Sequence, residues 1–253
     1  MDDDIFQKLR AEFIDDARDR VGDMMERLEL VERGRLAPGE ALLALRREAH
    51  SLKGMGASFG YLMISMIGHR LEDYLATADL AQDQARQDLR RHLDAVEMEL
   101  SRPNQCSHEQ MQAILRDLPM PRGQLPANVP QTKVEVMLVT ASRTVAKMAA
   151  DELRACGYRV IHAHSPLEAL TLCVRARPDL VLTSAVLEDM SGVDLLRALA
   201  VMGPTRDLPA AIVTSYGPGH AELRGVPEGA TILRLGPQFR DQLGEYLATL
   251  DLG

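Results

Sequence analysis

Several features are scarce or missing in this chain of 253 residues, and each absence narrows what the protein is. Tryptophan is absent, and aromatic residues make up only 4% of the chain. The three cysteines, Cys106, Cys156 and Cys173, are odd in number and lack C-x-x-C spacing. They predict neither a disulfide framework nor a zinc site, so we expect a reducing compartment, the cytoplasm.

Long apolar runs and an excess of positive charge are missing too. No run approaches the ~20 apolar residues that a membrane-spanning helix needs. The start M-D-D-D-I-F is acidic, whereas a secretory signal begins with basic residues. Lys+Arg against Asp+Glu is 17 to 23 in residues 1–125 and 12 to 14 in the remainder, a net charge of −8. We therefore expect neither a membrane nor a nucleic acid as a partner.

The first 118 residues have the period of amphipathic α-helices. Apolar residues recur at three- and four-residue spacing from the start of the chain until Gly34, and Pro38 is suited to open a second helix. Further helical periods cover residues 62–75, 83–100 and 107–118. Helices of this kind joined by short loops predict an all-α antiparallel four-helix bundle, followed by a short helix, over residues 1–118.

A proline-rich segment follows the helical region. Residues 119–130, P-M-P-R-G-Q-L-P-A-N-V-P, hold four prolines in twelve positions. Proline lacks an amide donor and disfavours helix in the residue before it. We expect an extended linker over residues 119–132 that separates two domains.

Beyond the linker, short apolar runs rich in β-branched residues alternate with helical periods. Continuous apolar strands between helices predict a parallel sheet that is covered on both faces. Five strands and five helices fit residues 133–253. This region is therefore expected to be an α/β doubly wound (βα)5 flavodoxin-like domain, which makes the chain multidomain.

One histidine of the helical region stands in an unusual context, R-R-E-A-H-S-L-K-G-M-G-A-S-F-G-Y. His50 lies opposite the apolar stripe of its predicted helix and therefore points to water. Arg46 and Arg47 come one turn before it, and Lys53 and Gly54 one turn after it. The apolar stripe consists of Leu42, Leu45, Ala49, Leu52, Gly56 and Phe59.

This context suits phosphoryl chemistry. A neutral imidazole nitrogen attacks a phosphoryl group without a separate base. Lys53 and the two arginines would offset the charge of a phosphorylated ring, or pair with acids of a partner. Gly54 costs about 1 kcal/mol of helix stability, which makes sense where a partner's backbone must come close. The alternative is that the cations are a solvated face and the glycines accommodate packing, as we expect for Gly56.

Residues 50–60, H-S-L-K-G-M-G-A-S-F-G, resemble the motif H-x-L-K-G-x-[AS]-x-x-x-G of histidine-containing phosphotransfer (Hpt) domains. Gly56 departs mildly from it, because alanine or serine is more usual there. The pair Leu71 and Glu72 also matches a leucine-glutamate pair of that family. The resemblance implies that His50 accepts a phosphoryl group from a kinase or a receiver aspartate and passes it to another receiver. Such a carrier has no nucleotide site, metal or cofactor of its own and is not an enzyme.

Residues 133–253 resemble a response-regulator receiver domain, and P-D-L-V-L-T-S-A-V-L-E-D-M-S-G-V-D-L-L-R-A-L aligns on its third strand, loop and third helix. Receiver domains of that family use an aspartate nucleophile, a pair of acids that holds Mg²⁺, a hydroxyl and a lysine. Ser184 stands at the nucleophile position, Thr140 and Ala141 at the acid pair, and Gly236 at the lysine; only Thr214, the hydroxyl, is kept. The domain is expected to be a pseudo-receiver, which cannot be phosphorylated by the family's mechanism.

Other residues of this domain are weaker candidates. Glu188 and Asp189 follow Ser184 but are expected to be solvated loop acids. His162 and His164 share one face of a strand but have no third ligand at suitable spacing. Residues 217–227 hold three glycines and two prolines where the receiver's fourth helix belongs, so that helix is expected to be lost and its contacts remodelled.

Two functions follow as hypotheses. In the first, the protein is a phosphorelay intermediate that carries phosphate on His50, and the pseudo-receiver is a binding, dimerisation or regulatory module. Its partners would be a sensor histidine kinase and the receiver domains of response regulators or hybrid kinases. In the alternative, the chain is a non-catalytic adaptor that binds or sequesters response regulators. The sequence leaves open whether the bundle forms a homodimer.

Overall fold

A computed structural model of the chain describes residues 2–102, 106–120 and 132–250. The chain divides into two units, Met1–Pro121 and Arg122–Gly253. Most of the predicted linker, residues 121–131, lies outside the described residues, so its extended conformation and the domain bounds drawn around it stay predictions. No described helix is both long enough and apolar enough to cross a bilayer.

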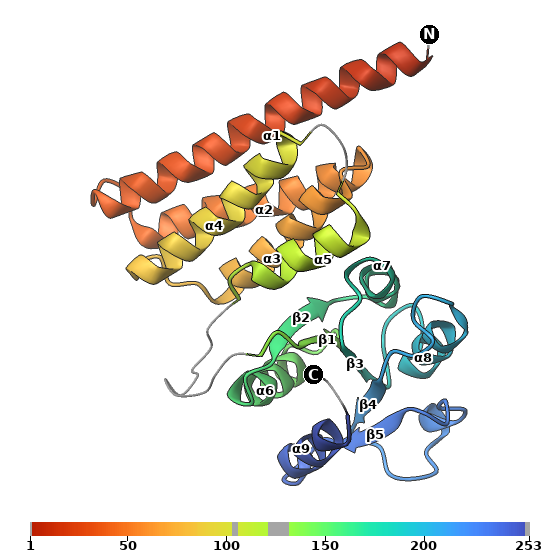
Figure 1. Cartoon of the computed structure of the whole chain (residues 1–253). Coiled ribbons are helices and arrows are strands. Elements are labelled where there is room, and N and C mark those ends of the chain that lie inside the picture. Colours follow the sequence, from red (N-terminus) through yellow and green to blue (C-terminus); the bar gives the residue numbers. More distant parts are fainter. Residues whose placement is uncertain (1, 103–105, 121–131, 251–253) are drawn as a thin grey trace. The chain divides into compact units, whose positions relative to one another are not determined.

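Every secondary-structure element among the described residues of the first unit is a helix, as its period predicts (Figure 1). Pro38 opens the second helix, and the fourth covers the predicted residues 83–100. Ser107 caps the fifth through a reciprocal pair of hydrogen bonds with Gln110. The helices are α1 (Asp2–Glu32), α2 (Pro38–Ser58), α3 (Leu62–Thr77), α4 (Asp83–Leu100) and α5 (His108–Asp117).

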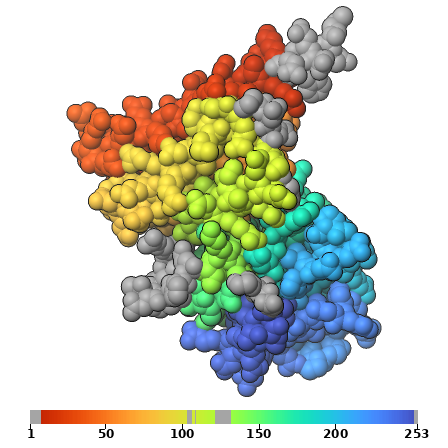
Figure 2. Space-filling model, in the orientation of Figure 1, coloured from red at the N-terminus to blue at the C-terminus, as the bar shows by residue number. Residues whose placement is uncertain are grey.

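The core of this unit forms because each helix buries one stripe of apolar side chains. On α1 the stripe keeps the expected three- and four-residue spacing. Its members are Phe13, Ala17, Val21, Met24, Leu28 and Val31. Side chains of α1 and α4 pack against each other in the space-filling view, where α1 is red and α4 is yellow (Figure 2). Burying each large apolar side chain contributes roughly 1.5–3 kcal/mol, so packing holds the bundle together.

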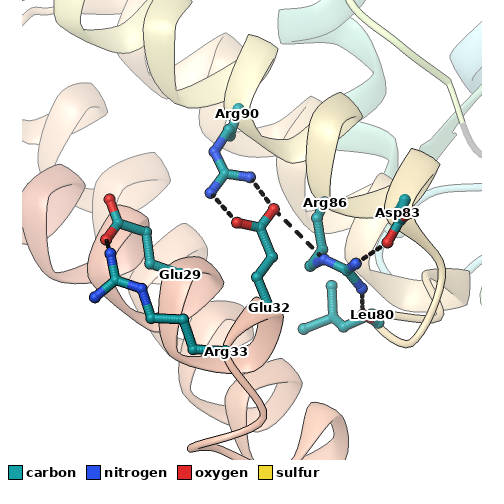
Figure 3. A network of polar contacts seen from close by, with 7 residues as sticks. All are labelled: Glu29, Glu32, Arg33, Leu80, Asp83, Arg86 and Arg90. Carbon is teal, nitrogen blue, oxygen red and sulfur yellow. Dashed lines mark hydrogen bonds and ion pairs between the residues drawn. The ribbon is translucent and has the colours of Figure 1, made fainter.

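A polar network joins the end of α1 to the start of α4 (Figure 3). Arg90 donates to both oxygens of Glu32, at 2.7 and 3.1 Å. Arg86 lies 3.7 Å from the same carboxylate, donates to the carbonyl of Leu80 at 2.5 Å and pairs with Asp83. The hydrogen bond from Arg90 lowers the pKa of Glu32 below its ordinary value. The pairs are partly exposed, so they fix where α4 crosses α1 more than they add stability.

The second unit is a five-stranded parallel sheet with the order β2-β1-β3-β4-β5. This is the flavodoxin-like order, and it confirms the predicted fold class. The strands are β1 (Glu135–Val139), β2 (Arg159–Ala163), β3 (Leu180–Ser184), β4 (Ala210–Thr214) and β5 (Thr231–Arg234). The helices are α6 (Arg143–Ala155), α7 (Pro166–Ala176), α8 (Gly192–Val201) and α9 (Phe239–Thr249).

The sheet is buried on both faces, which explains its continuously apolar strands. On one face, Met137, Ile161 and Val181 pack against α7 and α8. On the other, Val136 and Leu182 pack against α6 and α9. Figure 1 shows the two helix pairs on opposite sides of the strands.

The expectation of five helices in this unit is wrong for the described residues, because only a single 3-10 turn, η1 (Ala221–Leu223), lies between β4 and β5. Gly219 and Gly225 there have left-handed φ values of 79° and 76°, which a helix cannot include. Arg197 of α8 donates to the carbonyl of Gly225 at 2.8 Å and holds the segment in place. The predicted loss of helix over residues 217–227 is confirmed.

Buried His92 of α4 makes the bundle sensitive to acid. Burial lowers the pKa of His92 from 6.5 to about 4. An unfolded chain therefore binds this proton first as the pH falls, and α4 loses stability between pH 6.5 and 4, by about 3 kcal/mol in all. We expect His92→Gln to flatten this part of the profile, measured as the opening free energy of α4 amides by hydrogen exchange. Exposed His220 offers the control, since His220→Gln should leave the profile of α4 unchanged.

Candidate functional site

The site begins with an unusually close contact between α2 and α3, which two glycines permit. A Cβ atom on Gly56 would lie 2.7 Å from the backbone nitrogen of Ser65, and one on Gly68 would lie 2.8 Å from that of Lys53. Neither position has room for a side chain. The expectation that Gly56 allows tight packing against the next helix is confirmed, and Gly68 does the same from the other side.

His50 lies on the exposed side of this helix pair, with its side chain 79% exposed. Its Nδ1 is 2.8 Å from Oε1 of Glu72 on α3. An ionised carboxylate only accepts hydrogen bonds, so Nδ1 carries the hydrogen and donates it. The lone pair of the neutral ring is then on Nε2, which faces solvent. The ring is thus held in the tautomer whose outer nitrogen is a nucleophile.

Lys53 completes a three-residue cluster. Its Nζ lies 3.0 Å from Oε2 of Glu72, so the two oxygens of one carboxylate bind the lysine and the histidine. Lys53 is half-buried, and its charge lies one helical turn from His50. The expected neighbour of the histidine is therefore in place, with its ammonium group held by an acid from the next helix.

Glu72 is the residue whose role the sequence does not reveal. It stands 22 positions after His50, on another helix. Its carboxylate reaches the histidine only because α2 and α3 pair in one particular register, set by the turn at Gly60, whose φ is 78°. The signal available in the sequence is the leucine-glutamate pair at positions 71 and 72, which marks the residue without assigning it a contact.

The two arginines before His50 differ, although they were expected to act alike. Arg46 donates to the carbonyl of Leu75 at 3.0 and 2.7 Å and to that of Ala76 at 3.1 Å, so its guanidinium binds the end of α3. Arg47 is exposed and makes no hydrogen bond or ion pair with the described part of the chain. Arg47 is thus the cation of this pair that is available to an incoming group.

Gly54 leaves open space beside the histidine. A Cβ atom at this position would meet no atom within 4 Å, in contrast to Gly56 two residues later. Packing within the unit does not explain this glycine. Its expected role, to let a partner's backbone come close, stays a prediction.

In the second unit, the residues at the expected receiver positions do come together. Parallel pairing places Val139 beside Thr183 and Ser184 beside Val213, so the carboxyl ends of β1, β3 and β4 meet at one edge. Ser184 donates from Oγ to Oγ1 of Thr140 at 2.7 Å. The backbone nitrogen of Tyr216 donates to Oγ1 of Thr214 at 3.1 Å, and Ala141 and Gly236 stand exposed at the ends of their strands.

This edge holds hydroxyl groups where a divalent cation would require carboxylates. Among the described residues, no three or more His, Cys, Asp or Glu side chains are grouped as metal ligands. Glu188 and Asp189 are exposed on the following loop. The ring of His162 on the edge strand β2 stacks with that of His164, the first residue after this strand, with centroids 6.5 Å apart.

Residues 8–105 match the family model of the Hpt domain. The first unit carries an Hpt domain. The residues before position 8 and the helix α5 lie outside the match. His50, Lys53 and Glu72 all lie inside the matched range, so the cluster belongs to the Hpt domain.

The C-terminal part is similar to response regulators. It is 33% identical over 81 residues to the polar-differentiation response regulator DivK of Brucella anthropi. This match covers 32% of this chain and 66% of DivK. It is 28% identical over 95 residues to the phosphate regulon transcriptional regulatory protein PhoB of Pseudomonas aeruginosa, covering 38% of this chain and 42% of PhoB. The chain thus spans less than two thirds of either relative.

Solved structures of receiver proteins are also similar to this part. Chemotaxis response regulator CheY4 of Vibrio cholerae is 23% identical with a TM-score of 0.41, and the match covers 46% of this chain and 97% of CheY4. A response regulator from Desulfuromonas acetoxidans is 20% identical with a TM-score of 0.41, and the match covers 47% of this chain and 98% of that protein.

An Hpt domain followed by a receiver-like domain indicates two-component phosphorelay signalling.

The two glycines of α2 provide a matched test of the close helix contact. We expect Gly56→Ala to destabilise the Hpt domain by about 1–3 kcal/mol, because the added methyl group meets backbone atoms that cannot move aside. Gly54→Ala should stabilise it by up to about 1 kcal/mol, because alanine favours helix and the space is open. Urea denaturation followed by the helical circular dichroism signal measures both. Equal effects of the two substitutions would contradict the close contact.

Proposed function

We propose that the Hpt domain carries a phosphoryl group on Nε2 of His50, between a sensor kinase or a receiver aspartate and the receiver domain of a partner. The observation that carries this proposal is the cluster of His50, Glu72 and Lys53 on an exposed helix face. A histidine that is 79% exposed and yet fixed in one tautomer is poised for attack on a group that another protein presents.

In the proposed transfer, one bond forms at Nε2 of His50 and one bond breaks in the partner. The lone pair of Nε2 attacks the phosphorus of a partner's aspartyl phosphate, the N–P bond forms, and the P–O bond to aspartate breaks with its electron pair leaving on the carboxylate. The ring keeps its hydrogen on Nδ1 and gains positive charge. Glu72, 2.8 Å away, offsets that charge, and Lys53 holds Glu72 in place through its other oxygen. The partner supplies the aspartate and its Mg²⁺.

The surroundings of His50 support docking by a receiver. A receiver presents an acidic pocket, and exposed Arg47 lies one turn from the histidine on an otherwise acidic chain. Gly54 leaves room on the other side for a partner's backbone. We expect the kinase, or a hybrid kinase, to dock on the same face.

We infer further that the receiver-like domain takes no phosphate and acts as a binding, dimerisation or regulatory module. Ser184 and Thr140 bond to each other at 2.7 Å in the place of a nucleophile and a metal-binding acid, which supports this assignment. Gly236, at the lysine position, adds no charge. A 3-10 turn, η1, stands where a receiver has its fourth helix, so a partner of this face would meet a different surface.

The phosphocarrier role is tested by incubating the full chain with labelled phosphorylated receivers and with kinases charged by ATP. We expect acid-labile, alkali-stable label on the wild type and none on His50→Gln, because glutamine has no nucleophilic ring nitrogen. The alternative adaptor function predicts a different result. Wild type and variant would then bind receivers equally well, and neither would carry label.

The receiver-like domain is tested with beryllofluoride and Mg²⁺, which mimic an aspartyl phosphate in competent receivers. We expect the amide spectrum of residues 132–250 to stay unchanged, because no carboxylate stands at the positions of Ser184 or Thr140. A competent receiver in the same buffer is the positive control. A saturable response centred on the ends of β1, β3 and β4 would contradict the assignment.

A further inference from the structure

Helix α3 ends without a cap of its own. Its last turn contains no basic residue, and the residue that follows, Ala78, continues in an extended conformation with φ −65° and ψ 141°. The last four carbonyl groups of any α-helix have no partner within the helix. The end of α3 therefore depends on donors from elsewhere in the fold.

Arg46 of α2 supplies these donors. Its Nε and Nη2 reach the carbonyl of Leu75 at 3.0 and 2.7 Å, and Nη2 also reaches that of Ala76 at 3.1 Å. A guanidinium at a helix C-terminus is favoured both by these charge-assisted bonds and by the helix dipole. One side chain of α2 thus ties down the last turn of α3.

The contacts between α2 and α3 follow one antiparallel register. One turn after Arg46 on α2 comes His50, and one turn before Ala76 on α3 comes Glu72, so the two cross-helix contacts are adjacent. One further turn along, Gly68 meets the backbone of Lys53. The pair of His50 and Glu72 is therefore held between a guanidinium clamp on one side and a close backbone contact on the other.

We infer that Arg46 is a positioning residue for phosphotransfer, which holds the last turn of α3 so that Glu72 meets Nδ1 of His50. The inference rests on the proposed function of His50. Arg46 acts through Glu72 and does not bind the phosphoryl group, since its guanidinium is engaged with α3. This separates it from Arg47, which carries the same charge at the next position.

The first readout needs no phosphate. Nitrogen-15 spectra of the full chain report which ring nitrogen of His50 carries the hydrogen, with Glu72→Ala, which has no acceptor, as the reference for a lost contact. We expect Arg46→Gln to lose the excess of the Nδ1–H form, as Glu72→Ala does. Arg47→Gln should keep it. The outcome that overturns the inference is an unchanged ring state in Arg46→Gln.

The second readout is the rate at which ammonium phosphoramidate, a small phosphoryl donor, phosphorylates His50. We expect Arg46→Gln to lower this rate about tenfold. Arg33→Gln, which removes an exposed arginine paired with Glu29 on α1 and outside the site, should leave it within about twofold. An equal loss in both variants would assign the effect to charge alone and overturn the inference. If wild type takes no label from any donor, the proposed function fails, whereas the ring spectra still decide whether Arg46 positions the pair.

Arg46→Lys keeps the test open if Arg46→Gln does not fold. Lysine retains the charge but cannot place two nitrogens on one carbonyl, so we expect a partial loss of the Nδ1–H form and of the rate. If Arg46→Lys behaved like the wild type in both readouts, the inferred role of the guanidinium clamp would be overturned. Thermal unfolding of every variant, followed by circular dichroism, separates loss of fold from loss of the contact.

Discussion

The close contact between α2 and α3 is the constraint on which the rest of the Hpt domain's site depends. Gly56 and Gly68 remove the side chains that would keep the two backbones apart. With the helices this close, a glutamate on one reaches a histidine that remains exposed on the other. A wider separation would leave each side chain to solvent, where neither tautomer of the ring is favoured by a partner.

That geometry reconciles two demands that usually conflict. A group that reacts with another protein must be exposed, and exposed side chains are commonly free to rotate. Here only one ring nitrogen is used for anchoring, and the anchor, Glu72, is itself half-buried and held by Lys53. Order is therefore supplied from the helix interface, while the nitrogen that we propose to carry the phosphoryl group is left unanchored.

The sequence predicts the two fold classes because both depend on hydrophobic period, and it finds His50, Lys53 and Gly54 because they are neighbours on one helix. It cannot assign Glu72 to His50, since that contact depends on the register of two helices. Nor can it separate Arg46 from Arg47, which look alike until the end of α3 is placed beside one of them. The meeting of Thr140 and Ser184 follows more directly, because parallel strands bring their carboxyl ends to one edge.

The receiver-like fold does not depend on the residues at the ends of its strands. Its sheet is held by apolar side chains on both faces, and residues at the strand ends contribute little to that packing. Acidic groups crowded at such an edge repel one another unless a cation binds between them. Ser184 and Thr140 satisfy each other with one hydrogen bond and leave no charge to neutralise. The packing of the sheet therefore holds the fold without a cation between these two positions, and the fold alone does not decide what this edge does.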